Sequence, residues 1–217
     1  MSDIFIIGAT GGVGSRLTPM LVEAGHRVTA LHRKPEQADA LRNAGAKPCP
    51  GDIIEISIED LTTAMRGSDI IVFTAGAAGS GPDRTSAIDG DGVAKMIAAA
   101  RAGGIARIYL VSAFMDALRA NSPSENFEHY MSVKRQADSA LAATELEWVI
   151  LRPGTLVSED ASGLVNAGLA VPYGTVARGN VAAMLAKLID TAAIRREIIE
   201  LTDGDTPVRE AVNSLVR

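Results

Sequence analysis

The stretch IFIIGATGGVGSRL, residues 4–17, leads from a hydrophobic run through a glycine-rich turn into a helix-like segment. Its Gly8, Gly11 and Gly14 have the spacing Gly-x-x-Gly-x-x-Gly, in a predicted βαβ unit of about 30 residues. Bare glycines at such a turn let a diphosphate approach the backbone N–H groups, and the N-terminus of the following helix favours negative charge. The alternative is a strand–helix turn that needs glycine only for packing. The position at the first crossover favours a phosphate-binding loop.

Composition is typical of a globular α/β protein. The chain has 217 residues, of which 47% are hydrophobic and only 4% aromatic, and its formal net charge is −5. This charge, and the absence of a long basic run in the sequence, argue against nucleic acid or an anionic membrane as partner. One cysteine, Cys49, and three scattered histidines allow no disulfide within the chain and predict no metal site. With no signal-peptide pattern and no apolar run of about 18 residues, we expect a cytoplasmic protein with a small-molecule substrate.

Short apolar runs alternate with segments of helical periodicity along the whole chain. This alternation predicts an α/β fold, a Rossmann-like doubly wound parallel sheet of about seven strands with helices on both faces. We expect a single NAD(P)-binding domain over 1–217, with a small substrate-side lobe formed by 157–179 and the C-terminal segment. The predicted strands are 3–9, 27–32, 46–51, 69–76, 107–113, 147–154 and 197–204, and the predicted helices are 14–25, 35–45, 58–67, 91–104, 130–144, 180–192 and 207–216.

Two longer connections, 75–91 and 157–179, are predicted to be irregular. Both follow the carboxyl ends of predicted strands, where open α/β sheets bind their ligands. Asp89 and Asp91, near the start of the helix predicted at 91–104, are interpreted as capping carboxylates favoured by the helix dipole.

The end of the second predicted strand indicates which dinucleotide binds. A carboxylate there would hold the ribose hydroxyls of NAD, but this chain has Arg33 and Lys34 instead. An arginine at this place can pair with a 2′-phosphate and stack on adenine, so NADP is favoured over NAD; the alternative is an exposed basic turn. Asp52, after the third strand, is either an acceptor for the adenine amino group or a turn residue.

Tyr130 and Lys134 lie four residues apart at the start of the helix predicted at 130–144, which places them on one helix face. A nearby ammonium favours the phenolate, so we expect the lysine to lower the pKa of Tyr130 and to prepare it for proton transfer at a carbonyl or alcohol oxygen. Ser112 ends the fifth predicted strand. Its hydroxyl either donates to the same substrate oxygen or closes the strand by bonding to the backbone.

These features together resemble the short-chain dehydrogenase/reductase superfamily, and most closely its atypical single-domain branch of NAD(P)H-binding, NAD-dependent epimerase/dehydratase-like proteins. The motifs that carry the resemblance cover nearly the whole chain and come in the order typical of that branch. They are GATGGVG (8–14), LVSAF (110–114), YMSVK (130–134), LRPGTL (151–156) and VARGNVAAML (176–185).

The resemblance implies a role for each matching residue. The diphosphate would be held by Gly8, Thr10, Gly11, Gly12 and Val13, with Gly14 allowing the helix to pack closely on the strand. Arg33, beside Lys34, would meet the adenosine ribose or its phosphate, and Asp52 and Ile53 the adenine. Thr74, Ala75 and Gly76 would line the cofactor, Pro153, Gly154 and Thr155 would border the nicotinamide, and Ser112, Tyr130 and Lys134 would be the catalytic trio.

The resemblance implies an NADP(H)-dependent oxidoreductase that transfers hydride between nicotinamide and a small carbonyl or alcohol substrate. Two alternatives stay open: an NADP-binding redox sensor or scaffold without turnover, and a flavin or quinone reductase. The chain departs from the family at Ala113, where many members carry a second hydroxyl residue, and it lacks the large substrate lobe of sugar-nucleotide epimerases. Either a monomer or a homodimer is compatible with the sequence.

Overall fold

The computed structural model describes residues 1–117 and 123–217, and its main sheet has nine strands in the order β11-β8-β10-β6-β5-β4-β1-β2-β3. Seven of them, from β10 to β3, are parallel neighbours and correspond to the seven predicted strands. The predicted doubly wound α/β fold is confirmed. The strands are β1 (Asp3–Ile7), β2 (Arg27–His32), β3 (Lys47–Pro50), β4 (Ile70–Phe73), β5 (Arg107–Val111), β6 (Glu147–Pro153), β7 (Thr155–Val157), β8 (Leu164–Gly168), β9 (Thr175–Ala177), β10 (Glu197–Asp203) and β11 (Thr206–Pro207).

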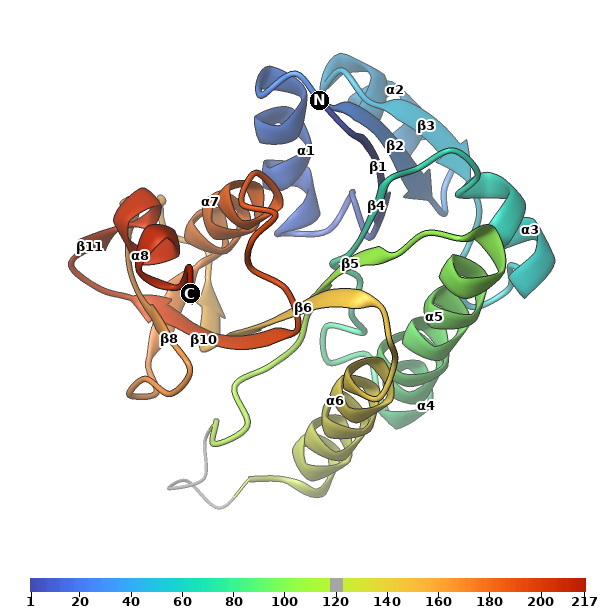
Figure 1. Ribbon diagram of the computed structural model, residues 1–217. Helices are drawn as coiled ribbons and strands as arrows, with labels where there is room; N and C mark the ends of the chain where they lie inside the picture. Colours follow the sequence, from blue (N-terminus) through green and yellow to red (C-terminus); the bar gives the residue numbers. More distant parts are fainter. Residues whose placement is uncertain (118–122) are drawn as a thin grey trace.

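Helices cover both faces of this sheet, as Figure 1 shows. Helices α1, α7 and α8 lie on one face, and α3, α5 and α6 lie on the other. The helices are α1 (Gly14–Glu23), α2 (Gln37–Asn43), α3 (Ile58–Ala64), α4 (Pro82–Thr85), α5 (Gly92–Gly103), α6 (Glu125–Ala142), α7 (Arg178–Ile189) and α8 (Val208–Ser214), with a π-helix, η1 (Ser86–Asp91), between α4 and α5.

Alternate residues of each central strand supply two separate cores. In β1, Ile4 and Ile6 pack with Leu17 of α1, whereas Phe5 and Ile7 belong to the core under α5. All four of these strand residues are buried. A strand with apolar residues on both sides is what a parallel sheet covered on both faces requires.

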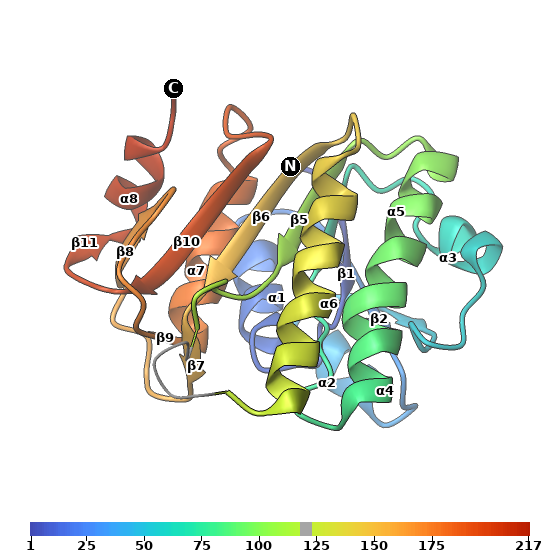
Figure 2. The same ribbon diagram turned by 90° about the horizontal axis from the view of Figure 1, so that it is seen from below.

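Two segments predicted to be irregular contain regular structure. Within 157–179, β8 joins the main sheet antiparallel to β10, and β9 pairs with β7 in a separate two-stranded sheet. Figure 2 shows β7 and β9 beside the carboxyl end of β6. In β8 only Val165 is fully buried, so no apolar run marks this strand in the sequence. Within 75–91, α4 and η1 form a continuous helical path into α5.

Helix α6 begins five residues earlier than predicted. The Oγ of Ser124 accepts a hydrogen bond from the N–H of Phe127, which is the geometry of a helix N-cap. The first turn is polar and exposed at Glu125 and Asn126, so hydrophobic periodicity does not reveal it. Tyr130 therefore lies in the second turn of α6. Among the helices described, none has the length and apolar character needed to cross a membrane.

Candidate dinucleotide and substrate site

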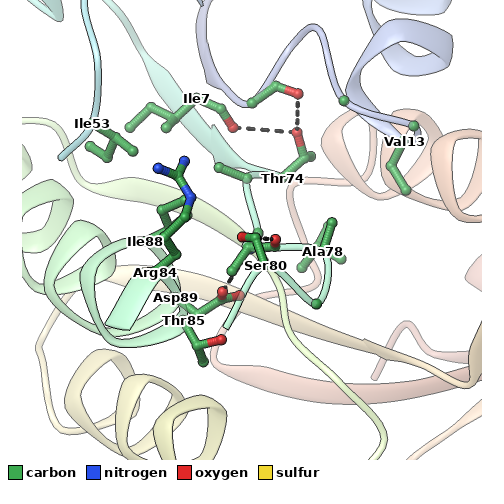
Figure 3. A pocket seen from close by; sticks show the side chains of 18 of the residues that line it. Ile7, Val13, Ile53, Thr74, Ala78, Ser80, Arg84, Thr85, Ile88 and Asp89 are labelled. Carbon is green, nitrogen blue, oxygen red and sulfur yellow. Dashed lines mark hydrogen bonds between the residues drawn. The ribbon is translucent and has the colours of Figure 1, made fainter. Parts of the chain in front are cut away.

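A cavity of about 1070 Å³ lies at the carboxyl ends of β1, β2, β4 and β5. Its walls come from the glycine loop, the end of β2, the turn after β3, the loop after β4 and one side of α6. Figure 3 shows Val13 and Ile53 at separate ends of this cavity, with Thr74 between them. The volume and the position are those of a dinucleotide site in an open α/β sheet.

The glycine loop presents unpaired backbone donors to this cavity. Among the described residues, the N–H groups of Gly12 and Val13 have no acceptor. Val13 is also the N-cap of α1, and no side chain caps that helix. Unpaired N–H groups at the positive end of a helix dipole suit an anion such as a diphosphate. Gly8 and Gly11 line the cavity beside them.

Close packing requires glycine at two positions of the loop. A Cβ at Gly8 would lie 2.4 Å from the backbone N of Ala75, and Gly8 has a φ of +95°. A Cβ at Gly14 would lie 2.3 Å from the carbonyl oxygen of Gly8. Gly14 is buried and does not line the cavity, so it brings α1 onto β1 rather than contacting a ligand.

The end of β2 places one of its two cations at the cavity. Arg33 lines it, but Lys34 does not and instead lies 4.0 Å from Glu36. Gln37, which no sequence pattern indicates, organises this corner. Its Oε1 accepts from the N–H groups of Arg33 and Lys34, and its Nε2 donates to the Oγ1 of Thr10 in the glycine loop.

The turn after β3 and the loop after β4 complete the cofactor walls. Asp52 and Ile53 both line the cavity, and the Oδ1 of Asp52 also accepts from the N–H of Ile54, so Asp52 closes its own turn as well. The hydroxyl of Thr74 donates to the carbonyl oxygens of Ile7 and Gly8, joining the ends of β4 and β1 (Figure 3). Ala75 and Gly76 follow on the same wall.

Ser112 and Tyr130 lie where the large cavity meets a second cavity of about 200 Å³. Both residues line both cavities, whereas Lys134 lines only the larger one. The smaller cavity also contacts each residue that was expected to border the nicotinamide, namely Pro153, Gly154 and Thr155. The remaining walls are apolar: Ala113, Phe114, Ala117, Phe127, Met131 and Leu156.

Lys134 is paired with a buried carboxylate. The Nζ of Lys134 lies 3.3 Å from the Oδ1 of Asp89 and 3.0 Å from the carbonyl oxygen of Val111. Asp89 is 1% exposed and its Oδ2 accepts from the N–H of Ala77. The interpretation of Asp89 as a capping carboxylate is therefore wrong, because its side chain turns into the protein and neutralises the lysine.

This arrangement reverses the expected effect on Tyr130. Its pKa is raised, chiefly by burial and then by the negative charges of Asp89 and Asp138. The prediction that Lys134 lowers this pKa is wrong, since the ammonium is already paired with Asp89. Tyr130 is therefore a neutral phenol at physiological pH and can donate a proton.

A second buried polar cluster lies behind Ser112. The Nε of Arg152 donates to the Oδ2 of Asp138 at 2.9 Å, and the Asp138 side chain is 3% exposed. Burial raises the pKa of Asp138, while Ser112, Arg152 and Lys134 each offset part of that rise. Among the described residues, neither the Oγ of Ser112 nor the Oδ1 of Asp138 has a regular hydrogen-bond partner. The Oγ of Ser112 is buried and lies beside the Asp138 carboxyl, and it is not used in closing β5.

Some cavity residues had no clear signal in the sequence. Gln37, Asp89 and Arg178 acquire their positions only through tertiary contacts. Arg84 on α4 also lines the cavity, and Figure 3 shows it extending toward Ile53. Its segment was predicted to be irregular, so no helix face indicated where it would point.

Comparison with known proteins agrees with this geometry. Residues 8–192 match the model of a family described as NAD(P)H-binding. The chain belongs to this NAD(P)H-binding family. It is 38% identical over 214 residues to the Bacillus subtilis protein "Uncharacterized sugar epimerase YhfK", covering 98% of this chain and 99% of that protein.

Two solved structures share the fold over nearly their whole length. A "Putative NAD-dependent epimerase/dehydratase" of Bacillus halodurans has a TM-score of 0.90 and 30% identity, covering 99% of this chain and 100% of that one. The oxidoreductase ylbE of Lactococcus lactis has a TM-score of 0.86 and 28% identity, covering 98% and 96%. The epimerase/dehydratase-like resemblance seen in the motifs is thus confirmed, and a nicotinamide cofactor is supported.

Proposed function

We propose that this protein is an NADP(H)-dependent oxidoreductase that transfers hydride between nicotinamide and a small carbonyl compound or the matching alcohol. The observation that carries the proposal is the position of Ser112 and Tyr130. Both residues line the dinucleotide cavity and the smaller apolar cavity. A carbonyl oxygen bound at this boundary would have two hydroxyl donors beside it, which is the arrangement that proton-assisted hydride transfer requires.

Each residue then has a distinct task. When bound, the nicotinamide supplies or accepts the hydride. Tyr130, whose pKa is raised, donates the proton to the substrate oxygen in the reductive direction. We assign to Ser112, which lines both cavities beside Tyr130, a hydrogen bond to the same oxygen. Lys134 lines the larger cavity, and we assign its ammonium to the nicotinamide ribose rather than to Tyr130.

The smaller cavity favours an uncharged substrate of modest size. Among its described lining residues there is no charged side chain. Its volume of about 200 Å³ is below the range that holds drug-sized ligands, so a ligand of one or two rings is favoured over a nucleotide sugar. Phe114 lies against Tyr173, with ring centroids 5.4 Å apart, and supplies an aromatic wall suited to a flat ring. Quinones therefore belong in the substrate panel, and flavins, whose three fused rings exceed this size, are its contrasting class.

The test is NADPH consumption on a panel of ketones, aldehydes, quinones and flavins, with wild type and Tyr130→Phe compared on every active substrate. Removing a general acid lowers turnover by about 10²- to 10⁴-fold, so we expect a loss of that size. Equal rates for the two proteins would exclude Tyr130 as the proton donor. Tight NADPH binding without turnover on any member would favour the redox sensor instead.

NADP specificity is part of the proposal and has its own test. Arg33 is exposed at the cavity edge, and residues 33–35 directly after β2 include no acid, which suits a 2′-phosphate. We expect Arg33→Ala to weaken NADPH binding by about 10-fold or more while leaving NADH binding within about 2-fold, because only NADPH carries the phosphate. An equal effect on both coenzymes would contradict the assignment.

A further inference from the structure

One cation at the cavity comes from the far end of the chain. Arg178 is the first residue of α7, is half-buried and lines the same cavity as the glycine loop. Among the described residues its guanidinium makes no ion pair with a carboxylate. A partly desolvated arginine without a counter-ion, facing a cavity, is poised for an anionic ligand.

The side chain of Arg178 crosses the loop at Gly12. A Cβ built at Gly12 would lie 2.6 Å from the Cδ and 2.8 Å from the Nε of Arg178. The arginine thus fills the space that a side chain at Gly12 would take. The Nη1 donates to the Oγ of Ser158 at 2.8 Å, which anchors one end of the guanidinium. In the part of the chain that the structure describes, its other nitrogens have no acceptor.

The neighbouring groups identify the ligand chemistry. The unpaired N–H groups of Gly12 and Val13, the uncapped start of α1 and the Arg178 guanidinium form one positive region around Gly12. A guanidinium binds phosphate oxygens through two parallel hydrogen bonds, and these charge-assisted bonds are stronger than those from a neutral donor. We propose that Arg178 binds the diphosphate of the nicotinamide dinucleotide and covers the glycine loop from its exposed side. This inference rests on the proposed function only in requiring that a dinucleotide occupies the cavity.

Coenzyme affinity without substrate tests the inference, with NADPH and adenosine 2′-monophosphate as probes. The second probe keeps the phosphate that Arg33 is expected to meet but has no diphosphate. Loss of a charge-assisted contact predicts that Arg178→Ala weakens NADPH binding by about 10- to 100-fold and the monophosphate by less than about 2-fold. Arg178→Lys, which keeps the charge without the planar fork, should lie between Arg178→Ala and wild type.

The matched control is Arg16→Ala. Arg16 also reaches this loop, since its Nη1 donates to the carbonyl oxygen of Gly12 at 2.7 Å, but it does not line the cavity. The control removes the same charge near the same glycine and should change NADPH affinity by less than about 3-fold. Thermal unfolding of each variant without ligand shows whether the fold is intact.

Three results would overturn the inference: NADPH affinity of folded Arg178→Ala within about 2-fold of wild type, equal losses for the two probes, or an equal loss in Arg16→Ala. A protein that binds NADPH through Arg178 but reduces no substrate would leave the inference standing and refute the proposed enzyme. Wild type that binds neither nicotinamide coenzyme would refute both.

Discussion

Asp89→Asn tests the buried ion pair that governs the site. The substitution keeps the shape of the side chain and an oxygen that can accept from the N–H of Ala77, but it removes the charge facing Lys134. Lys134 is 2% exposed, so its ammonium would be left in the interior with the carbonyl oxygen of Val111 as its remaining partner. The change therefore isolates the electrostatic part of the contact.

The known cost of breaking a buried pair gives the size of the effect. Removing one partner of such a pair costs about 3–5 kcal/mol, because the other charge is left buried without compensation. For a chain of this size each kcal/mol lowers Tm by about 2–4 °C, so we expect a fall of about 6–20 °C.

The same substitution changes the titration of Tyr130. Asp89 raises the pKa of this phenol, so removing its charge and releasing the Lys134 ammonium both lower that pKa. In wild type the folded pKa is above the unfolded value of about 10, so a reductive rate that depends on the neutral phenol stays level up to about pH 10. In Asp89→Asn the alkaline fall should begin at lower pH.

Thermal unfolding at pH 7 and ultraviolet titration of the phenol, with Tyr130→Phe to assign the signal, measure both effects. Asp91→Asn is the matched control, because Asp91 lies on the same π-helix but is exposed. The double variant Asp89→Asn/Lys134→Met should recover much of the stability, since it removes both charges of this pair and leaves neither one unpaired. If Asp89→Asn unfolds at the same temperature as Asp91→Asn, the Asp89–Lys134 ion pair does not stabilise the fold by the expected amount of about 3–5 kcal/mol.

Two further substitutions test the packing and the second buried pair. Gly14→Ala places a Cβ 2.3 Å from the carbonyl oxygen of Gly8 and should lower the stability by several kcal/mol or prevent folding. The control Gly67→Ala, whose Cβ would meet nothing within 4 Å, should cost only about 1 kcal/mol for its φ of +83°. Urea unfolding of both variants measures the difference, and equal losses of stability would contradict the close contact at Gly14. Arg152→Met leaves the Asp138 carboxylate buried without its cation, which raises the folded pKa of Asp138 further above its unfolded value. The folded state then binds the Asp138 proton more tightly than the unfolded state does, so the loss of stability grows as the pH rises. We expect a loss of about 3–5 kcal/mol at pH 7 and a smaller loss at pH 5. An equal loss at both pH values would show that Asp138 does not titrate in this range.

The features that the sequence predicts correctly depend on local order along the chain. Strand–helix alternation identifies the seven parallel strands, because each is apolar on both faces and is followed by a helix. The glycine loop is recognisable because turn, strand and helix are adjacent in sequence. The antiparallel strand β8 escapes the same reasoning, since one buried valine and an exposed leucine leave no pattern.

The features that the sequence did not predict depend on contacts between distant residues. Gly12 and Arg178 lie at opposite ends of the chain, and only the docking of α7 beside the glycine loop brings them together. Gln37 reaches Thr10 across the β2 turn in the same way. Spacing rules apply to one helix or one turn at a time, so they cannot predict contacts between residues of different elements.

The four-residue spacing of Tyr130 and Lys134 predicts where the two side chains lie but not their chemistry. It places two side chains on one face of α6, and the structure agrees. The chemistry of the pair depends on a third residue, Asp89, which a π-helix 45 positions earlier turns into the interior to meet the lysine. The insertion of one extra residue into a helical turn changes which side chains face inward, and π-bulges of this kind are frequent at functional sites. A lysine that is neutralised in this way does not favour the phenolate, so Tyr130 stays a protonated and weak acid, which would give its proton only to an oxygen that becomes strongly basic during hydride transfer.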